Sequence, residues 1–466
     1  MGKSKLERRG KLFFDLYGEN FSPHEIAITA IDIGKTHAVA GVFGYFGEVL
    51  HESFLLTPDR RGVDLLCQLA EETAVRCGRK HVVYSFEHTG HYHEPVAALL
   101  RERNCTVLPL NPVTTKKERE SDLDRSKTDE LDTHYIAAAV SAGKVVTDRP
   151  LRPEQEELRF ISRHRRSLVQ RRANAFVELH VLIDHYWPAF QGIPEVAGGK
   201  AHVERIFAKT WPERALRFLE LVSTPAEALV LGEAGLQELS RRERLALGAR
   251  RIRLILRAAE LAPKVSKSLI EQYVERLRAV LNSIKELDKH IEALEDRCQQ
   301  LLADSRGVLL LTMRQVGAVT AAEYMAEIGF LVPSLHSASA VIKLAGTNPV
   351  PDQSGNRRRM RKISKQGVVH YRTLTYQLGS NLFYGKGNPY FQAFGRRLTH
   401  LKPKQIRIAV GNKAHRVIFA MLKNGEVFAP KTWTGPPLTM NPLLKLKPCY
   451  QERAREQLLR LGITGY

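Results

Sequence analysis

The stretch EIAITAIDIGKTHAVAGVFGYFGEVLHESFL, residues 25–55, contains three short, β-branched apolar runs separated by DIGKT and GYFGE. Runs of this length, bounded by glycine-containing turns, are typical of strands, and their close succession predicts a three-stranded meander. Helical spacing follows over 60–78, then a buried-type strand in HVVYSF, a helix over 94–104 and a strand in CTVLPL. Strands that follow one another and then alternate with helices predict an α/β domain with a mixed central sheet.

The rest of the chain is predominantly helical. Residues 154–187 have helical spacing and one very basic face, and 195–262 are also mostly helical. From 270 to 301, apolar residues recur at steps of three and four: Ile270, Val274, Leu277, Leu281, Ile284, Leu287, Ile291, Leu294, Cys298 and Leu301. This seam predicts a coiled coil or a long amphipathic helix. It packs either onto its own domain or against another subunit, and the sequence leaves both alternatives open.

The C-terminal part begins with LLLTMRQVGAVTAAEYMAEIG, which predicts a helix, a glycine-containing turn and a second helix. A loop rich in Gly, Pro and Asn is expected over 345–367. We therefore expect five parts: a basic tail at 1–24, the α/β domain at 25–150, a helical region with an insertion and coiled coil at 151–306, a mainly α-helical domain at 307–440, and a tail at 441–466.

Composition indicates a polyanionic partner. The 466 residues carry 71 Lys and Arg against 50 Asp and Glu, a net charge of +21. Residues 353–425 contain 16 Lys or Arg and no acid, so the polyanion is expected against this segment. No apolar run is long enough to span a membrane and no signal peptide is visible, so we expect no membrane partner and a cytoplasmic, nucleoid-associated protein. The five cysteines lack C-x-x-C spacing, which argues against structural zinc and a disulfide framework.

Four carboxylates are candidates for a metal site. Asp32 ends the apolar strand AIDIG and Glu87 ends VVYSFE. Packing of a buried-type strand seldom requires an acid at its end, because burying an unpaired carboxylate is costly. Asp129 and Asp132 lie three apart at the start of an expected helix over 128–145, and so share a face. Ser126 and Asp129 also fit a capping box, and this pair alone favours helix initiation. Four converging carboxylates would repel one another unless cations such as Mg²⁺ neutralised them.

These motifs carry a resemblance. The order Asp32, Glu87, Asp129, Asp132, set in AIDIGKTH, EHTGHY, LPLNP and KTDELDTHYIA, resembles the DEDD transposases of the bridge-RNA-guided insertion-sequence 110 type. The catalytic domain of that family is similar to RuvC and has the RNase H fold. GAVTAAEYMAEIG, LAGTNPVPDQSG and RKISKQGVVHYR resemble the family's C-terminal transposase domain, in which a serine is the nucleophile. The matches cover about 25–150 and 307–425. Two positions depart from the pattern: residues 314–317 read RQVG instead of P-G-x-G, and Thr133 replaces the usual alanine.

The resemblance implies a recombinase that cuts and rejoins donor and target DNA. The four carboxylates would hold Mg²⁺, and Ser354 would attack the scissile phosphate and form a phosphoserine link. A guide RNA is implied, as is a homo-oligomer, a dimer or tetramer in which the serine and the carboxylates meet across subunits. The coiled-coil seam at 270–301 is the expected contact between these subunits. The expected nucleic-acid contacts are Arg357, Arg358, Arg359, Arg361, Lys362, Lys365 and Arg372.

Other functions stay open at this point. A hydrolytic junction endonuclease needs the acids but not Ser354, and a non-catalytic nucleic-acid scaffold needs only the charge. DIGKTH also resembles the phosphate-binding turn of actin-like sugar kinases, but the chain has no second glycine-rich phosphate loop. The histidines at 88, 91 and 93 have no further zinc-ligand motif nearby.

Overall fold

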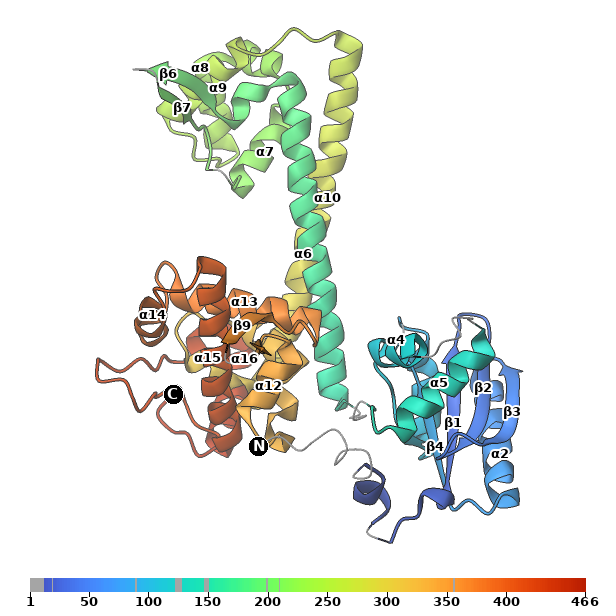
Figure 1. The fold of residues 1–466 in the computed structure, drawn as a ribbon. Coiled ribbons are helices and arrows are strands. Elements are labelled where there is room, and N and C mark those ends of the chain that lie inside the picture. Colours follow the sequence, from blue (N-terminus) through green and yellow to red (C-terminus); the bar gives the residue numbers. More distant parts are fainter. Residues whose placement is uncertain are drawn as a thin grey trace. The chain divides into compact units, whose positions relative to one another are not determined.

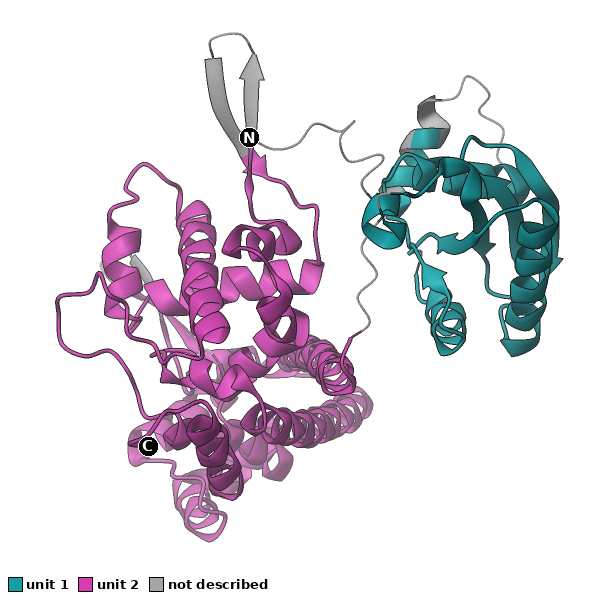
Figure 2. Cartoon of the chain, turned by 90° about the horizontal axis from the view of Figure 1, so that it is seen from below, with its two compact units in different colours: residues 1–150 teal, residues 151–466 magenta. Residues whose placement is uncertain are grey.

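The computed structural model describes residues 12–18, 20–88, 90–121, 128–145, 151–197, 200–208, 210–354 and 357–466. The chain divides into two compact units, Met1–Pro150 and Leu151–Tyr466, drawn in teal and magenta in Figure 2. None of the described helices combines the length and the apolarity needed to cross a membrane.

The N-terminal unit is built on a mixed five-stranded sheet. Its strands are β1 (Ile26–Ile33), β2 (Ala38–Gly44), β3 (Val49–Leu56), β4 (His81–Phe86) and β5 (Thr106–Val107). The spatial order is β3-β2-β1-β4-β5, with β1, β2 and β3 antiparallel and β1, β4 and β5 parallel. The predicted meander and mixed sheet are therefore confirmed. Such a sheet is compatible with the expected RNase H-like domain.

Helices cover both faces of this sheet. On one face, α2 (Arg60–Arg76) and α3 (His93–Glu102) bury Ala27, Ile31 and Phe86. On the other face, α5 (Asp129–Ser141) packs on Ile28, Ala30 and Val83, and α4 (Pro112–Ser121) adjoins it. Residues 12–17, expected as part of a tail, are helical and contribute the fully buried Phe13 to the α5 face. Alternate residues of β1 thus belong to different cores, as the period of a strand requires.

Two long antiparallel helices form the axis of the C-terminal unit. In Figure 1, α6 (Pro153–Tyr186) and α10 (Lys267–Ala303) lie side by side. Their ends are matched by ion pairs, from Arg297 with Glu157 at one end to Arg276 with Glu178 at the other. The apolar seam of α10 packs within its own unit: Leu277, Leu281 and Ile284 are buried in one core of the unit, and Cys298 and Leu302 in the other. The sequence left open whether the seam packs onto its own domain or against another subunit, and the structure shows it packed within the chain.

An insertion packs against one end of the helix pair. It contains α7 (Glu213–Leu221), α8 (Pro225–Arg242) and α9 (Ala249–Glu260), which share a core with α6 and α10. It begins with a hairpin of β6 (Ile193–Ala197) and β7 (Lys200–Glu204), two strands that the prediction of a mostly helical 195–262 did not include. The hairpin's β-branched residues, the buried Ile193 and the exposed Val196 and Val203, are of the type that favours strands.

The other end of the pair carries a helical domain. Its described helices are the 3₁₀ helices η3 (Arg306–Thr312), η4 (Gly329–Ser334) and η5 (Leu443–Lys445), and the α-helices α11 (Ala318–Glu327), α12 (Ala338–Ala345), α13 (Val369–Phe383), α14 (Pro389–Arg396), α15 (Pro403–Asn424) and α16 (Pro448–Arg460). The first helix of the predicted helical hairpin is thus 3₁₀. The prediction of a loop over 345–367 was wrong, because β8 (Pro349–Ser354) and β9 (Arg357–Ile363) form an antiparallel pair. The Gly-Asn dipeptide at 355–356, which favours hairpin turns, was the overlooked signal.

Candidate active site in the N-terminal unit

Sheet register brings Asp32 and Glu87 to the same level. Ile31 of β1 is registered with Phe86 of β4 in a parallel pair, and the two acids are the next residues on these strands. Since neighbouring residues at one level of a sheet point to the same face, the two side chains share a face. Ile28 and Ala30 lie on the same side of β1 as Asp32 and belong to the core beneath α5, so this is the face that α5 covers. Both acids are half-buried there.

Helix α5 contributes one of its two aspartates to the same layer. Asp132 is only 7% exposed and lies one turn before Ile136, a member of the core between α5 and the sheet. The hydroxyl of the next residue, Thr133, lies 3.2 Å from that of Ser53 on β3. Phe54, which follows Ser53, is registered with Ala40, and Ala40 with Ile31. The first turn of α5 therefore lies at the level of the sheet where Asp32 is found.

Asp129 differs from Asp132 in its surroundings. It is the first residue of α5 and is exposed. The cap of the helix is Thr128, whose side chain accepts a hydrogen bond of 3.2 Å from the backbone of Leu131. The expected capping box with Ser126 is thus replaced by a Thr128 cap, and Ser126 lies outside the described residues. A threonine just before the first helical residue satisfies the same free N–H groups as serine would.

The carboxylates lie around the layer between α5 and the sheet, but they are not grouped as the ligands of a metal ion. Within the described ranges, no group of three or more His, Cys, Asp or Glu side chains is close enough to hold a metal ion. His88 and His93, whose ring centres lie 4.6 Å apart, are among the described residues and belong to no such group. The fold brings Asp32, Glu87 and Asp132 to one face of the sheet, and Asp129 lies at its margin. Their oxygen donors are of the kind that Mg²⁺ prefers.

The predicted nucleophile belongs to the C-terminal unit. Ser354 is the last residue of β8 and is registered with Arg357, the first residue of β9. The side chains of Ser354, Arg357, Arg358, Arg359 and Arg361 lie outside the described part of the structure. After the hairpin, Lys362 and Lys365 are exposed. The guanidinium of Arg372 donates a 3.0 Å hydrogen bond to the carbonyl of Lys365 and so holds this segment against α13.

The basic face predicted on 154–187 has a structural role. Arg163 donates two hydrogen bonds of 2.9 Å to Glu327 of α11. Arg166 pairs with Glu323 of the same helix, and Arg172 pairs with Asp288 of α10. These guanidinium groups are therefore already neutralised within the chain, which makes them weak candidates for phosphate contacts.

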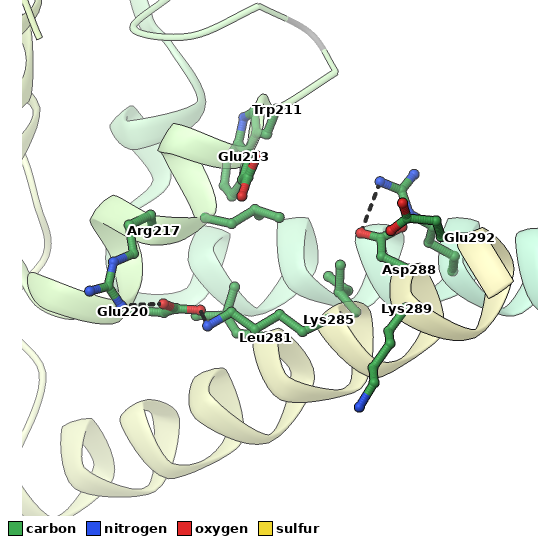
Figure 3. Close-up of a pocket in the computed structure, with 12 residues that line it drawn as sticks. Trp211, Glu213, Arg217, Glu220, Leu281, Lys285, Asp288, Lys289 and Glu292 are labelled. Atoms are coloured by element: carbon green, nitrogen blue, oxygen red, sulfur yellow. Dashed lines mark hydrogen bonds and ion pairs between the residues drawn. The ribbon is translucent and has the colours of Figure 1, made fainter. Parts of the chain in front are cut away.

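A cleft of about 790 Å³ in the C-terminal unit contains none of the predicted site residues. It lies between α7, α6 and α10, and Figure 3 shows Lys285 and Arg217 both paired with Glu220 at its edge. Its lining holds equal numbers of acidic and basic side chains above the buried Leu281 and Trp211. A charge-balanced lining does not favour a phosphate backbone.

Two family models match the chain. One, described as transposase, matches residues 29–188, which include all four predicted carboxylates. The other, described as the transposase IS116/IS110/IS902 family, matches residues 308–395, which include Ser354. The insertion and α10 lie between the two matched ranges. No curated protein matches the chain.

Proposed function

Because the chain belongs to the IS110-type DEDD transposases, we propose that it cuts and rejoins DNA strands with the carboxylates Asp32, Glu87, Asp129 and Asp132 and the nucleophile Ser354. The chain is a DNA transposase, and the roles of these residues are the proposal. The observation that carries it is the common level of Asp32 and Glu87 on parallel strands, with Asp132 in the same layer.

The carboxylate set suits a divalent ion, which we propose to be Mg²⁺. Asp32, Glu87 and Asp132 offer only carboxylate oxygens from one face of the sheet, and exposed Asp129 can join them from the helix end. A bound Mg²⁺ supplies Lewis-acid stabilisation of charge on the scissile phosphate. No three of these ligands are grouped among the described residues, so their side chains would have to move together to share an ion.

The serine step preserves the energy of the phosphodiester bond. The Ser354 hydroxyl loses its proton and its oxygen forms a bond to phosphorus, while the bond from phosphorus to one deoxyribose oxygen breaks and that oxygen leaves as a hydroxyl after taking up a proton. In the reverse sense, a hydroxyl of a second strand attacks the phosphoserine and releases Ser354. No water is consumed, so strands are exchanged without net hydrolysis.

Two further parts of the proposal concern partners. A structured bridge RNA guides the enzyme, and the acid-free segment 353–425, with Lys362, Lys365 and the arginines of β9, contacts nucleic acid. The enzyme acts as a dimer or tetramer in which one subunit's Ser354 serves another's carboxylates. The seam of α10 that suggested the oligomer already packs within the chain, so the subunit contact uses other surfaces.

The decisive experiment incubates the full-length protein with labelled junction DNA and Mg²⁺, followed by denaturing electrophoresis. Wild-type protein should yield a slowly migrating protein–DNA adduct, and Ser354→Ala should yield none. RNA recovered with the purified protein is sequenced in parallel, and one discrete structured species is expected.

The hydrolytic alternative gives a different pattern. A RuvC-like endonuclease would produce free cut ends without an adduct, and Ser354→Ala would cut as fast as wild-type protein. That result would remove Ser354 from the mechanism while leaving the carboxylates in it. A protein that binds the junction but never cuts it would be a scaffold.

A further inference from the structure

The cations on the described helices of the acid-free segment differ from those of α6 in their pairing. Within the described residues, no Lys or Arg from 362 to 423 forms an ion pair with a carboxylate. This contrasts with α6, whose arginines pair with Glu327, Glu323 and Asp288. The helices α13, α14 and α15 therefore present uncompensated positive charge, which favours a polyanion at this surface.

One of these cations lies over two aromatic rings. The guanidinium carbon of Arg407, on α15, lies 5.2 Å from the ring centre of Tyr376 and 4.8 Å from that of Tyr384. Arg407 also donates a hydrogen bond to the Tyr376 hydroxyl, which raises the pKa of the guanidinium. Tyr384 caps the C-terminal end of α13, where a helix dipole favours a cation.

Close helix packing holds this arrangement in place. A Cβ at Gly379 of α13 would lie 1.9 Å from the carbonyl oxygen of Arg407, and one at Gly411 would lie 2.4 Å from that of Thr375. The two glycines thus allow α13 and α15 to cross almost in backbone contact. Arg407 is seated over Tyr376, one turn before Gly379, with little freedom to move.

Tyr384 differs from the other aromatic residues of the segment in its exposure. Tyr371 and Phe391 are almost fully buried in the core of the domain, whereas Tyr384 is 39% exposed. Two exposed cations flank it. Lys386 is two residues further along the chain, and Lys404 lies one turn before Arg407 on α15. Lys386 is anchored through its carbonyl, which accepts a 2.8 Å hydrogen bond from the Gln315 side chain.

We propose that Tyr384, supported by Arg407 and Tyr376, stacks an unpaired base of a nucleic-acid strand, with Lys386 and Lys404 near the flanking phosphates. An aromatic ring fixed beside cations is the usual device for holding single strands, because every base has a π-face. A preorganised guanidinium adds cation–π attraction at little entropic cost. This inference rests on the proposed function, since a transposase must hold strands whose bases are unpaired, but it concerns binding and not cleavage.

The test measures binding by the full-length protein. Fluorescence anisotropy follows single-stranded DNA and RNA of one sequence, about 12 nucleotides long, and the corresponding DNA duplex. The variants are Tyr384→Leu, Tyr384→Phe and, as a matched control on α6, Phe160→Leu, because Phe160 is 72% exposed in the same unit. Circular dichroism and thermal unfolding verify that each variant folds.

Tyr384→Leu should bind a single strand about tenfold more weakly, the loss of one base stack, and should bind the duplex as wild-type protein does. Tyr384→Phe and Phe160→Leu should bind like wild-type protein. A loss confined to DNA or to RNA identifies the strand that occupies the site. Unchanged single-strand binding by Tyr384→Leu, or an equal loss for the duplex, would overturn the proposal. Repeating the comparison in a Ser354→Ala background keeps it independent of the covalent mechanism.

Discussion

Asp32 and Glu87 lie side by side in the register of two parallel strands, each one residue beyond the pair Ile31 and Phe86. This relationship joins two acids that are 55 positions apart along the chain. Crossovers through α2 produce the parallel pairing, so the proximity of the two acids depends on the sheet and not on either local motif.

Asp32→Asn and Glu87→Gln should each lower the rate of DNA cleavage about a hundredfold or more, because each removes a charged ligand from the proposed metal site. Cleavage of labelled junction DNA at saturating protein and Mg²⁺ measures this. The matched control is Glu130→Gln, since Glu130 is an exposed acid of α5 between the two aspartates and has no proposed role. Equal losses in all three variants would show a general effect of charge instead of a defined site.

Gly379→Ala should destabilise the C-terminal unit by about 3 kcal/mol, because the added Cβ would overlap the Arg407 carbonyl oxygen and force α13 and α15 apart. Gly317→Ala is the control: a Cβ there meets nothing within 4 Å and the backbone φ is −91°. Its cost should stay below about 1 kcal/mol. Denaturant unfolding compares the two, and a Gly379→Ala variant as stable as wild-type protein would contradict the close helix crossing.

Glu327→Gln should destabilise the protein by about 2 kcal/mol. The Glu327 carboxylate is 5% exposed and accepts both hydrogen bonds of Arg163, so its neutralisation leaves a half-buried guanidinium without a counter-charge. The loss of stability should be smaller than for a fully buried pair, because the Arg163 side chain is 36% exposed and water screens its charge. In a double-mutant cycle, Arg163→Met should recover part of the loss, and additive effects would rule out a direct coupling.

Acid should destabilise the helical domain through His415. Burial lowers the pKa of this histidine to about 3, and its ring lies 2.9 Å from the Thr375 hydroxyl. Because the unfolded chain takes up the proton near pH 6.5 and the folded chain does not, stability is retained above pH 6.5 and lost as pH falls toward 3. Between pH 6.5 and 5 the loss from this group is about 2 kcal/mol.

Comparison with His415→Gln checks that pH dependence. The variant has no titrating ring at this position, so its denaturation midpoint should change less between pH 6.5 and 5 than that of wild-type protein. Parallel curves for the two proteins would assign the acid sensitivity to other groups.

The local sequence pattern was sufficient to predict most of the helices and strands. The strands at 26–33 and 38–44 were predicted because apolar, β-branched runs bounded by turns depend on neighbouring residues only. The hairpin at 349–363 was missed because its Gly, Pro and Asn content also suits a loop, and pairing with a second strand is not visible locally. For the same reason the seam of α10 indicated that one face is buried but not that α6 covers it.

The candidate site divides in the same way. Sequence by itself determined the chemistry: which residues are acidic, that they end strands or begin a helix, and that 353–425 carries positive charge without acids. Only the tertiary structure decided which side chains share an environment. It set Asp132 inside the layer and Asp129 at its surface, paired the arginines of α6 with Glu323, Glu327 and Asp288, and left Tyr384 exposed beside Arg407. Residue type and spacing are properties of the local chain, whereas burial and pairing depend on segments that meet only when the chain has folded.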